Sequence, residues 1–217
     1  MILVPVKNLS HAKQRLASLL DQATRTELAQ AMLLDVAETL ASWATRPETA
    51  LVTSDPFACD LAQRFDFAVI PDSANRSETD AIEMATTVCE LRGVDFTLVI
   101  PGDIPLMQAW ELEKILQTAP ETGAVLAPAA DGRGTNAAFR RPAGLFPLQF
   151  GNDSFNPHLA AARATGKPVV VLPLPGVALD VDSPADLREL AESPGETRSQ
   201  RMVRRFNLAD LPLAANQ

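Results

Sequence analysis

The sequence predicts an α/β domain in which a mostly parallel sheet lies between two layers of helices. Short apolar runs typical of buried strands alternate with longer segments whose apolar residues recur at helical spacing. The chain of 217 residues is long enough for one large domain with a proper core and short for two. We therefore expect a single-domain three-layer sandwich over residues 1–192 and a C-terminal tail over residues 193–217.

The first hundred residues contain the clearest alternation of strands and helices. Strands are expected at residues 1–6, 50–53, 67–70 and 96–100. Helices are expected at residues 10–19, 24–43, 54–65 and 78–92. Ser10 can cap the first of these helices, Ser54-Asp55-Pro56 can start the third, and Pro71 ends the strand before the fourth.

Beyond residue 100 the alternation continues to residue 191. Helices are expected at residues 110–117, 156–164 and 185–191, and strands at residues 124–127, 136–139, 168–172 and 177–181. Ser183-Pro184 begins the last helix, with proline at its favoured first position. From Ser193 the pattern stops, so we expect a tail that wraps the surface or is partly disordered. The tail arginines could hold a phosphate or a partner, but a solvated tail is the simpler interpretation; they are Arg198, Arg201, Arg204 and Arg205.

The composition argues against several classes of protein. A net charge of -8 disfavours broad nucleic-acid binding, which needs a basic surface. No apolar run approaches the roughly 20 residues that cross a bilayer, and the first residues lack the basic region of a signal sequence, so we expect no membrane partner. Cys59 and Cys89 make neither a disulfide framework nor a zinc site, and the cytoplasm is the simplest location. The oligomeric state stays open, with a homodimer as one candidate.

Three aspartates follow apolar runs of the predicted sheet. Asp103 comes directly after Val99-Ile100-Pro101-Gly102, and Asp180 and Asp182 lie in Leu179-Asp180-Val181-Asp182. Ligands of α/β sheets bind where the strands end. Clustered carboxylates are costly unless a hard cation neutralises them, and Mg²⁺ takes oxygen ligands of this kind. We therefore expect Asp103, Asp180 and Asp182 to hold Mg²⁺ beside a phosphate group.

Simpler roles exist for two of these aspartates. Asp103 could be a turn residue or a helix cap. Asp182 could belong to a helix cap with Ser183 and Asp186, but that interpretation leaves Asp180 unexplained. Two residues apart on a strand, Asp180 and Asp182 would share one face and repel each other, which a divalent cation would relieve.

The amino-terminal segment supplies the candidate phosphate-binding cations. Lys7, Lys13 and Arg15 lie where a strand, a turn and a helix start follow one another, the usual geometry for holding phosphates. The sequence has no glycine before Gly93, so cationic side chains would replace a glycine-rich loop. The alternative for each residue is a solvated helix with scattered positive charge.

Two later loops offer neutral hydrogen-bond donors. Residues 131–136 contain two glycines followed by Thr135 and Asn136, and residues 150–154 end in Ser154 before a helix. Glycine lets the backbone approach an anion closely, and Ser154 could cap the helix or bind a phosphate. A hairpin turn is the alternative for the first loop, since Asp-Gly is a strong turn signal. His11 and His158 are expected to be packed or solvated.

Taken together, these motifs resemble the 2-phospho-L-lactate guanylyltransferase family, which also includes enzymes that act on phosphoenolpyruvate or 3-phosphoglycerate. Val4-Pro5-Val6-Lys7 followed by Ala12-Lys13-Gln14-Arg15-Leu16 resembles the opening of the family. The further matches are residues 99–106 to its Pro-x-Asp-x-Pro-Leu segment, 131–136 to its Gly-Thr-Asn loop, 150–161 to its Phe-Gly-x-x-Ser-Phe-x-x-His-Leu segment and 179–187 to its Leu-Asp-x-Asp-x-Pro-x-Asp-Leu segment.

The resemblance implies a nucleotide-diphospho-sugar transferase-like fold and a guanylyltransferase of coenzyme F420 biosynthesis. Its partners would be GTP and a small phosphorylated three-carbon acid, with Mg²⁺ as cofactor and diphosphate released. By position, the resemblance assigns the metal to Asp103, Asp180 and Asp182, the phospho-acid to Thr135, Gly151 and Ser154, and the nucleotide to Lys7, Lys13, Arg15 and Asp80. Lys13 and Arg15 would act in catalysis.

One segment departs from the family pattern. Residues 78–82 read Glu-Thr-Asp-Ala-Ile, where the family often has Gly-Leu-Asn-Ala-Ala. An acidic segment near the nucleotide keeps open a nucleotidyltransferase with a different base or acceptor. A non-catalytic nucleotide-binding homologue is the remaining alternative, although all three aspartates are present.

Overall fold

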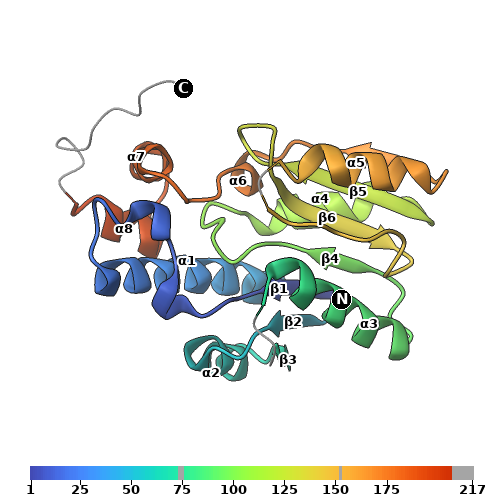
Figure 1. Cartoon of the computed structure of the whole chain (residues 1–217), viewed down its shortest axis with the longest axis horizontal. Helices are drawn as coiled ribbons and strands as arrows, with labels where there is room; N and C mark the ends of the chain where they lie inside the picture. Colours follow the sequence, from blue (N-terminus) through green and yellow to red (C-terminus); the bar gives the residue numbers. More distant parts are fainter. Residues whose placement is uncertain (73–75, 152, 207–217) are drawn as a thin grey trace.

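A twisted seven-stranded sheet forms the centre of the computed structural model, which describes residues 1–72, 76–151 and 153–206 (Figure 1). The strand order is β3-β2-β1-β4-β6-β5-β7. The strands are β1 (Ile2–Pro5), β2 (Thr49–Val52), β3 (Ala68–Ile70), β4 (Thr97–Val99), β5 (Gly123–Pro128), β6 (Thr135–Arg141) and β7 (Val169–Val171). Of these strands only β6 runs antiparallel to its neighbours, so the prediction of a mostly parallel sheet is confirmed.

Helices cover both faces of the sheet. One face packs against α1 (Gln22–Ser42), α2 (Pro56–Arg64), α4 (Ala109–Thr118) and α6 (Pro175–Ala178). The other face packs against α3 (Glu78–Leu91) and α5 (Phe155–Ala164). Along β1, Ile2 and Val4 join the first core and Leu3 joins the second, because successive side chains of a strand point to opposite faces. The three-layer α/β sandwich is therefore confirmed.

A third, smaller core lies outside the sheet, under α1, α7 (Pro184–Glu192) and α8 (Arg198–Val203). Its buried members include Leu16, Met32 and Val181, which come from three separate parts of the chain. Burying one such side chain stabilises the fold by about 1.5–3 kcal/mol. This outer core therefore fixes two loops against helix α1: the amino-terminal loop that contains Leu16 and the loop before α7 that contains Val181.

Residues 10–19 do not form the continuous helix that the sequence suggests. The structure has two short 3₁₀ helices, η1 (Leu9–His11) and η2 (Gln14–Leu16), separated by Ala12 and Lys13. Lys13 adopts the left-handed conformation, with φ of 54°, which interrupts helical hydrogen bonding. The prediction of a regular helix was wrong because it took no account of the interactions that the Lys13 side chain makes.

The strand expected at residues 177–181 is also wrong. Pro175 starts the single turn of α6, and residues 179–182 continue as an extended loop. The buried carboxylate of Glu111 accepts a hydrogen bond of 2.7 Å from the Gly176 N–H and one of 2.9 Å from the Gln108 N–H. Glu111 therefore anchors α6 from 65 residues away, which local periodicity cannot reveal.

The segment expected to be a tail contains an ordered helix. In α8, Ser199, Gln200 and Val203 are buried, and Asp35 of α1 accepts hydrogen bonds from the backbone N–H groups of Arg198 and Ser199 at 2.8 and 2.9 Å. The tail arginines also have protein partners: Arg198 pairs with Glu38, and Arg204 pairs with Glu196 and nearby carbonyl groups. Residues 207–217 of the expected tail lie outside the described residues.

The strand order places one edge of the sheet in position to bind a ligand. The chain leaves β1 for β2 on one side and later returns to place β4 on the other side of β1. The carboxyl ends of such diverging strands leave a crevice where ligands bind. Because β6 is reversed, its first residue, Thr135, lies at the same edge as the ends of β1 and β4. No helix in the described part of the chain is long and apolar enough to span a membrane.

We expect Asp35→Ala to detach α8 from α1. The substitution leaves the buried Ser199 N–H and hydroxyl without the partner that they have now, at 2.9 and 2.6 Å. Losing these bonds should lower the free energy of unfolding by about 2–4 kcal/mol in urea titrations. The control is Glu38→Gln, which breaks a partly exposed pair with Arg198 and should cost less than about 1 kcal/mol. Equal losses in the two variants would contradict this role of Asp35.

Candidate active site

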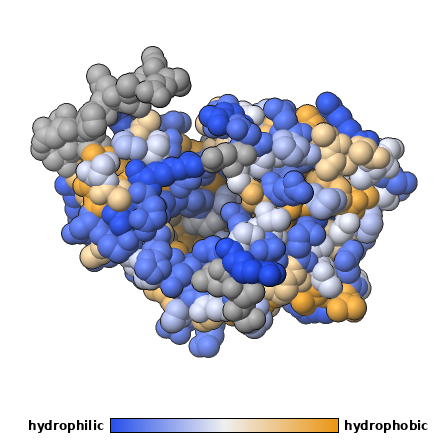
Figure 2. Space-filling model, viewed as in Figure 1, coloured by the Kyte–Doolittle hydropathy of each residue, from blue (hydrophilic) through white to orange (hydrophobic). Residues whose placement is uncertain are grey.

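Two adjoining cavities of about 460 and 570 Å³ open at the carboxyl edge of the sheet. We call them the first and second chambers; both are lined by Glu78, Pro101, Asp103 and Asp182. The first chamber also has apolar walls, including Leu9 and Leu33, whereas the second is lined mainly by polar residues of the loops around β6 and α5. Figure 2 shows this face hollowed at its centre, with a largely hydrophilic rim.

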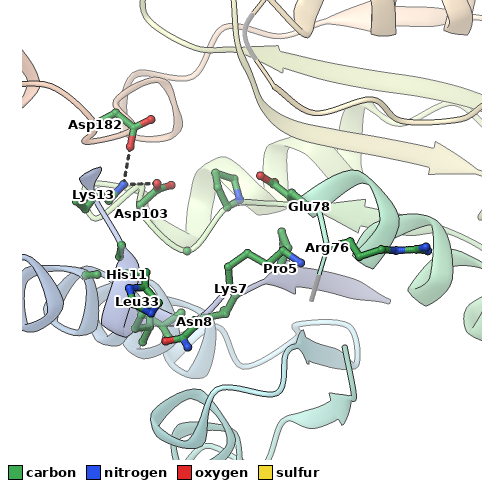
Figure 3. A pocket seen from close by; sticks show the side chains of 16 residues that line it. Pro5, Lys7, Asn8, His11, Lys13, Leu33, Arg76, Glu78, Asp103 and Asp182 are labelled. Carbon is green, nitrogen blue, oxygen red and sulfur yellow. Dashed lines mark hydrogen bonds and ion pairs between the residues drawn. The ribbon is translucent and has the colours of Figure 1, made fainter. Parts of the chain in front are cut away.

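Lys13 joins two carboxylates at the divide between the chambers. Its Nζ lies 2.5 Å from Asp103 Oδ2 and 2.9 Å from Asp182 Oδ1, as Figure 3 shows. Only 7% of the Lys13 side chain is exposed. Burial acts to lower the pKa of Lys13, but the charges and hydrogen bonds of Asp103 and Asp182 outweigh it, so the pKa is raised. Lys13 is therefore a fixed cation at neutral pH.

The local backbone explains how Lys13 reaches this position. Its left-handed conformation turns the side chain out of the path of a regular helix, and Leu16, three residues later, is fully buried in the outer core. A non-glycine residue in this conformation costs about 1–2 kcal/mol. The two ion pairs offset that cost, and strain of this kind is typical of functional sites.

Asp103 follows β4 through a turn that packs closely on α1. A Cβ on Gly102 would lie 3.0 Å from Leu33 Cδ1, so a larger residue would require the Leu33 side chain to shift. The Asp103 carbonyl accepts a hydrogen bond of 3.2 Å from the Val181 N–H, which ties this turn to the loop carrying Asp180 and Asp182. Asp103 Oδ1 is buried and has no hydrogen-bond partner among the described residues.

Asp180 and Asp182 point into the cleft from the extended loop after α6. Asp180 Oδ1 lies 3.0 Å from Asn136 Nδ2, while Asp182 faces Lys13 and lies 3.8 Å from Arg15 Nη1. Burial, together with the charges of Asp103 and Asp182, raises the pKa of Asp180 against the effect of the Asn136 hydrogen bond. Burial also acts to raise the pKa of Asp182, but Lys13 and then Arg15 outweigh it and lower that pKa.

The helix-cap alternative for Asp182 applies only to its backbone. Ser183 and Asp186 form the capping box of α7, and Asp182 contributes its N–H to Asp186 Oδ2 at 2.9 Å. Its own carboxylate is left for the cleft. The three aspartates therefore line one cavity, although they come from segments far apart in the sequence.

The charge balance of the cleft suits a cation, although three ligands are not preassembled. No three acidic, histidine or cysteine side chains in the described ranges are grouped closely enough to hold one metal ion. However, Asp103 Oδ1 lacks a hydrogen-bond partner within those ranges, and burial, with smaller effects of the charges of Asp103 and Asp182, raises the pKa of Asp180. Carboxylate oxygens of this kind fit a hard cation such as Mg²⁺.

Glu78 is the acidic residue of the divergent segment that reaches the cleft. It lines both chambers, and burial together with the charges of Asp103 and Asp182 raises its pKa to about 7. Asp80, which the sequence suggested for nucleotide binding, is exposed, pairs with Arg76 at 3.5 Å and is absent from the lining of both chambers. In Figure 3, Glu78 lies on the opposite side of the pocket from His11.

The candidate phosphate-binding cations are divided between the chambers. Lys7 lines the first chamber and pairs with Asp72 at 2.7 Å. Lys13 lines the first chamber at its divide, whereas Arg15, 63% exposed, lines the second. A ligand that spans the divide would therefore meet cationic groups on both sides.

The three candidate substrate-binding residues all line the second chamber. Thr135 starts β6, and its N–H donates to Ser154 Oγ at 3.1 Å. Ser154 stands at the start of α5 without a side-chain capping bond, so its hydroxyl is not used as a helix cap. Gly151 has φ of 140°, a conformation that favours glycine. The hairpin turn that the sequence offered as an alternative is also present between β5 and β6, so this loop is both a turn and part of the cavity wall. Asn152 lies outside the described residues.

His158 lies behind this wall as a packed side chain, one of the two roles that the sequence predicts for it, although its contacts were not predicted. It is 1% exposed, and its Nδ1 and Nε2 lie 2.9 Å from Thr135 Oγ1 and 2.8 Å from the Gln149 backbone N. Its place in the Phe-Gly-x-x-Ser-Phe-x-x-His-Leu segment was the only signal in the sequence. Its partner Thr135 is 23 residues away, so spacing alone could not identify the contact.

The fold is shared with nucleotidyltransferases of known structure. The chain is similar to a protein from Desulfovibrio desulfuricans G20 described as a nucleotide-diphospho-sugar transferase, with a TM-score of 0.76, 19% identity and coverage of 94% of this chain and 93% of that one. It is also similar to CMP:2-keto-3-deoxy-manno-octonic acid synthetase, with a TM-score of 0.57, 15% identity and coverage of 88% and 95%. The chain thus has the same fold as these proteins.

Sequence relatives define the family more closely. The model of the family described as "Guanylyl transferase CofC like" matches residues 1–213, and the chain belongs to this family. A phosphoenolpyruvate guanylyltransferase of Roseiflexus castenholzii is 36% identical over 204 residues, which cover 94% of this chain and 93% of the relative. A 2-phospho-L-lactate guanylyltransferase of Methanothermobacter thermautotrophicus is 30% identical over 210 residues, covering 97% and 92%. The resemblance seen in the sequence motifs is confirmed.

The raised pKa of Glu78 predicts a pH-dependent gain in stability for Glu78→Gln. In the folded protein the pKa of Glu78 is about 7, whereas its pKa in the unfolded chain is 4.5. The folded state therefore binds the proton more tightly, and the wild type loses stability as the pH rises from 4.5 to 7. Glutamine cannot ionise. The melting temperature of the variant, relative to wild type, should therefore rise between pH 4.5 and 7 and stay level above it, measured in EDTA.

The matched control for this measurement is Glu113→Gln, an exposed carboxylate on α4. A difference between Glu78→Gln and wild type that is the same at every pH, or that simply follows the control, would contradict the assigned environment of Glu78.

Proposed function

We propose that this protein transfers a guanylyl group from GTP to a phosphorylated three-carbon acid and releases diphosphate. The observation that carries the proposal is the divided cleft, in which Asp103 and Asp182 are shared by an apolar-walled chamber and a polar one. Phosphoenolpyruvate and 2-phospho-L-lactate are the first acceptors to consider, because the relatives at 36% and 30% identity are named for them. The family resemblance supports a place for this reaction in coenzyme F420 biosynthesis.

The first chamber suits the nucleotide. Leu9, Ala29 and Leu33 offer apolar surface for a base or ribose, and Lys7 and Lys13 supply positive charge for phosphates. The triphosphate would extend toward the divide, where Lys13 exchanges part of its contact with Asp103 and Asp182 for phosphate oxygens. Its raised pKa keeps Lys13 charged during that exchange.

The second chamber suits the phospho-acid. Thr135, Gly151 and Ser154 lie together on its wall and offer hydroxyl and backbone groups to an anion. Arg15 and Arg133 add positive charge, although Arg133 is already paired with Asp153. A small acid with one phosphate needs both kinds of contact, because ionised phosphate accepts hydrogen bonds and attracts guanidinium groups.

The reaction is an in-line displacement at phosphorus. An oxygen of the acceptor phosphate bonds to the α-phosphorus of GTP, and the bond from that phosphorus to the bridging oxygen of the β-phosphate breaks, so that diphosphate leaves. A phosphate monoester is largely ionised at neutral pH, so no strong general base is required. Lys13 and Arg15 stabilise the charge that develops on the transferred and departing groups, and the chamber walls position the reactants.

Asp103, Asp180 and Asp182 would hold Mg²⁺ in this site. The three carboxylates that line the second chamber, and the Asp103 oxygen that has no hydrogen-bond partner among the described residues, support this assignment. When bound, the ion would supply positive charge to phosphate oxygens at the divide. The aspartates themselves orient Lys13, which lies between two of them.

Glu78 keeps open one alternative, a nucleotidyltransferase that prefers another base. It lines the nucleotide chamber where the family often has an uncharged residue, and a carboxylate accepts hydrogen bonds from exocyclic amino groups. Guanine and cytosine both carry such a group. The choice of base therefore needs a direct test.

Diphosphate release should be measured over four nucleoside triphosphates and three acceptors: phosphoenolpyruvate, 2-phospho-L-lactate and 3-phosphoglycerate. We expect release with GTP and Mg²⁺ that depends on one of the acceptors, together with a guanylylated acid detected by mass spectrometry. Release with CTP in preference to GTP would overturn the base assignment. Nucleotide binding without turnover on any acceptor would instead show a non-catalytic homologue.

Asp103→Asn should lower turnover on the order of 10²-fold or more, because it removes one charge at the divide and keeps the side-chain shape. Since the variant also loses one ion pair of Lys13, its melting temperature should fall, and circular dichroism at the assay temperature must show that it is folded. The matched control is Asp60→Asn, an exposed aspartate of α2 outside both chambers, which should keep wild-type turnover. Near-normal diphosphate release by Asp103→Asn would remove Asp103 from the reaction.

A further inference from the structure

Behind the wall of the second chamber, the His158 ring links Thr135, which lines the chamber, to the backbone of Gln149, which precedes the lining residue Phe150. Nε2 lies 2.8 Å from the Gln149 backbone N, and Nδ1 lies 2.9 Å from Thr135 Oγ1. Phe150 packs edge-on against the ring, with ring centroids 5.1 Å apart. The imidazole is 1% exposed, so its contacts are made with protein groups and it has little freedom to turn.

The direction of these hydrogen bonds follows from elementary chemistry. A backbone N–H can only donate, so Nε2 of His158 accepts from Gln149. A neutral imidazole that accepts at one nitrogen carries its proton on the other. Nδ1 therefore donates to Thr135 Oγ1, and the Thr135 hydroxyl must direct its own proton elsewhere.

The surroundings of His158 keep this arrangement fixed. Burial, and then the positive charge of Arg140, lower the pKa of His158 to about 4. A second ring proton would also face the Gln149 N–H, donor against donor. The imidazole thus stays neutral, with one tautomer, across the physiological range.

Ser154 is set in the same way. Its Oγ accepts the Thr135 N–H at 3.1 Å and makes no capping bond to α5, so its hydroxyl proton also needs another acceptor. No acceptor for either hydroxyl is present among the described residues, and both residues line the second chamber. Two O–H donors are thus available to an anion that enters it.

We propose that His158 is a positioning residue that fixes the Thr135 hydroxyl as a hydrogen-bond donor to the phosphate of the acceptor. The inference rests on the proposed function and deepens it. A phosphate dianion has only acceptor oxygens, so it needs hydroxyl groups that donate. Without His158, the Thr135 hydroxyl could rotate and present its lone pairs instead, which would repel the phosphate.

Two amide substitutions, each of which mimics one ring nitrogen, separate the two ends of the ring. In His158→Asn, the amide nitrogen takes the place of Nδ1 and can still donate to Thr135, but Gln149 loses its acceptor. In His158→Gln, the amide oxygen takes the place of Nε2 and can still accept from Gln149, but the donor to Thr135 is lost. A purely structural role in anchoring the Gln149 loop would favour His158→Gln over His158→Asn.

We expect His158→Gln to raise the KM for the phospho-acid by about tenfold, the loss expected for one hydrogen bond to a charged group, while the KM for GTP stays within about twofold. His158→Asn should keep the KM for the phospho-acid within about threefold of wild type. The reverse order, or equal effects on both substrates, would overturn the proposal. Melting temperatures of the two variants show whether either has lost its fold. If one has, Thr135→Val and Thr135→Ser are compared instead, and only Thr135→Val should raise the KM for the phospho-acid.

A second readout is independent of turnover. The chain has two histidines, so ¹⁵N-histidine NMR with a His11→Gln variant assigns the His158 ring. We expect a protonated Nδ1 and an unprotonated Nε2 at neutral pH; the opposite tautomer, or a charged ring, would overturn the proposal. If wild type shows this tautomer but no turnover with any nucleotide and acceptor, the proposed function fails while the hydrogen-bond assignment stands.

Discussion

The double ion pair of Lys13 is the interaction on which the cleft depends. Lys13 is separated in the sequence from Asp103 by 90 positions and from Asp182 by 169 positions. The two ion pairs therefore fix the amino-terminal loop, the turn after β4 and the loop before α7 relative to one another. A buried ion pair is weak evidence for stability, because desolvation of the charges can exceed their attraction. Here Lys13 also adopts a strained backbone. Function explains this combination better than stability does, since a cation held between carboxylates can exchange partners with a metal and phosphates.

The hydrophobic cores explain why the ion pair is held in place. Leu16 lies three residues after Lys13, and Val181 lies directly before Asp182; both are fully buried beside Met32 of α1. The burial of Leu16 and Val181 therefore positions the charged side chains of their neighbours Lys13 and Asp182. Behind the second chamber, hydrogen bonds from the buried ring of His158 hold Thr135 and the Gln149 backbone instead.

Most of the fold could be predicted because its strands and helices carry strong local patterns. Both faces of β1 are buried, and its sequence is accordingly a continuous apolar run. The start of α7 is marked by Ser183 as the capping residue and Pro184 as the first helical residue. The errors have long-range causes. Glu111 sets α6 from a distant helix, Asp35 holds α8, and Lys13 breaks an otherwise plausible helix. None of these contacts leaves a mark in local periodicity.

In the candidate site, too, some residues could be predicted from local sequence patterns and others depend on long-range contacts. Asp103 follows a strand and Ser154 precedes a helix, so their places at one edge could be predicted, whereas Thr135 starts β6 and reaches that edge only because β6 runs antiparallel to its neighbours. Glu78 and His158 could not be placed, because their roles depend on which side chains face them across the cleft. Asp80 was chosen from the same segment as Glu78, but helical geometry directs only one of the two into the chambers.

A crystal structure with Mn²⁺ and a GTP analogue carrying a methylene group between its α- and β-phosphorus atoms tests the central claim most directly. We expect anomalous Mn²⁺ density at Asp103 together with Asp180 or Asp182, the base in the first chamber, the α-phosphate at the divide, and Lys13 Nζ on a phosphate oxygen. A nucleotide bound outside the first chamber, or Mn²⁺ away from all three aspartates, would contradict it.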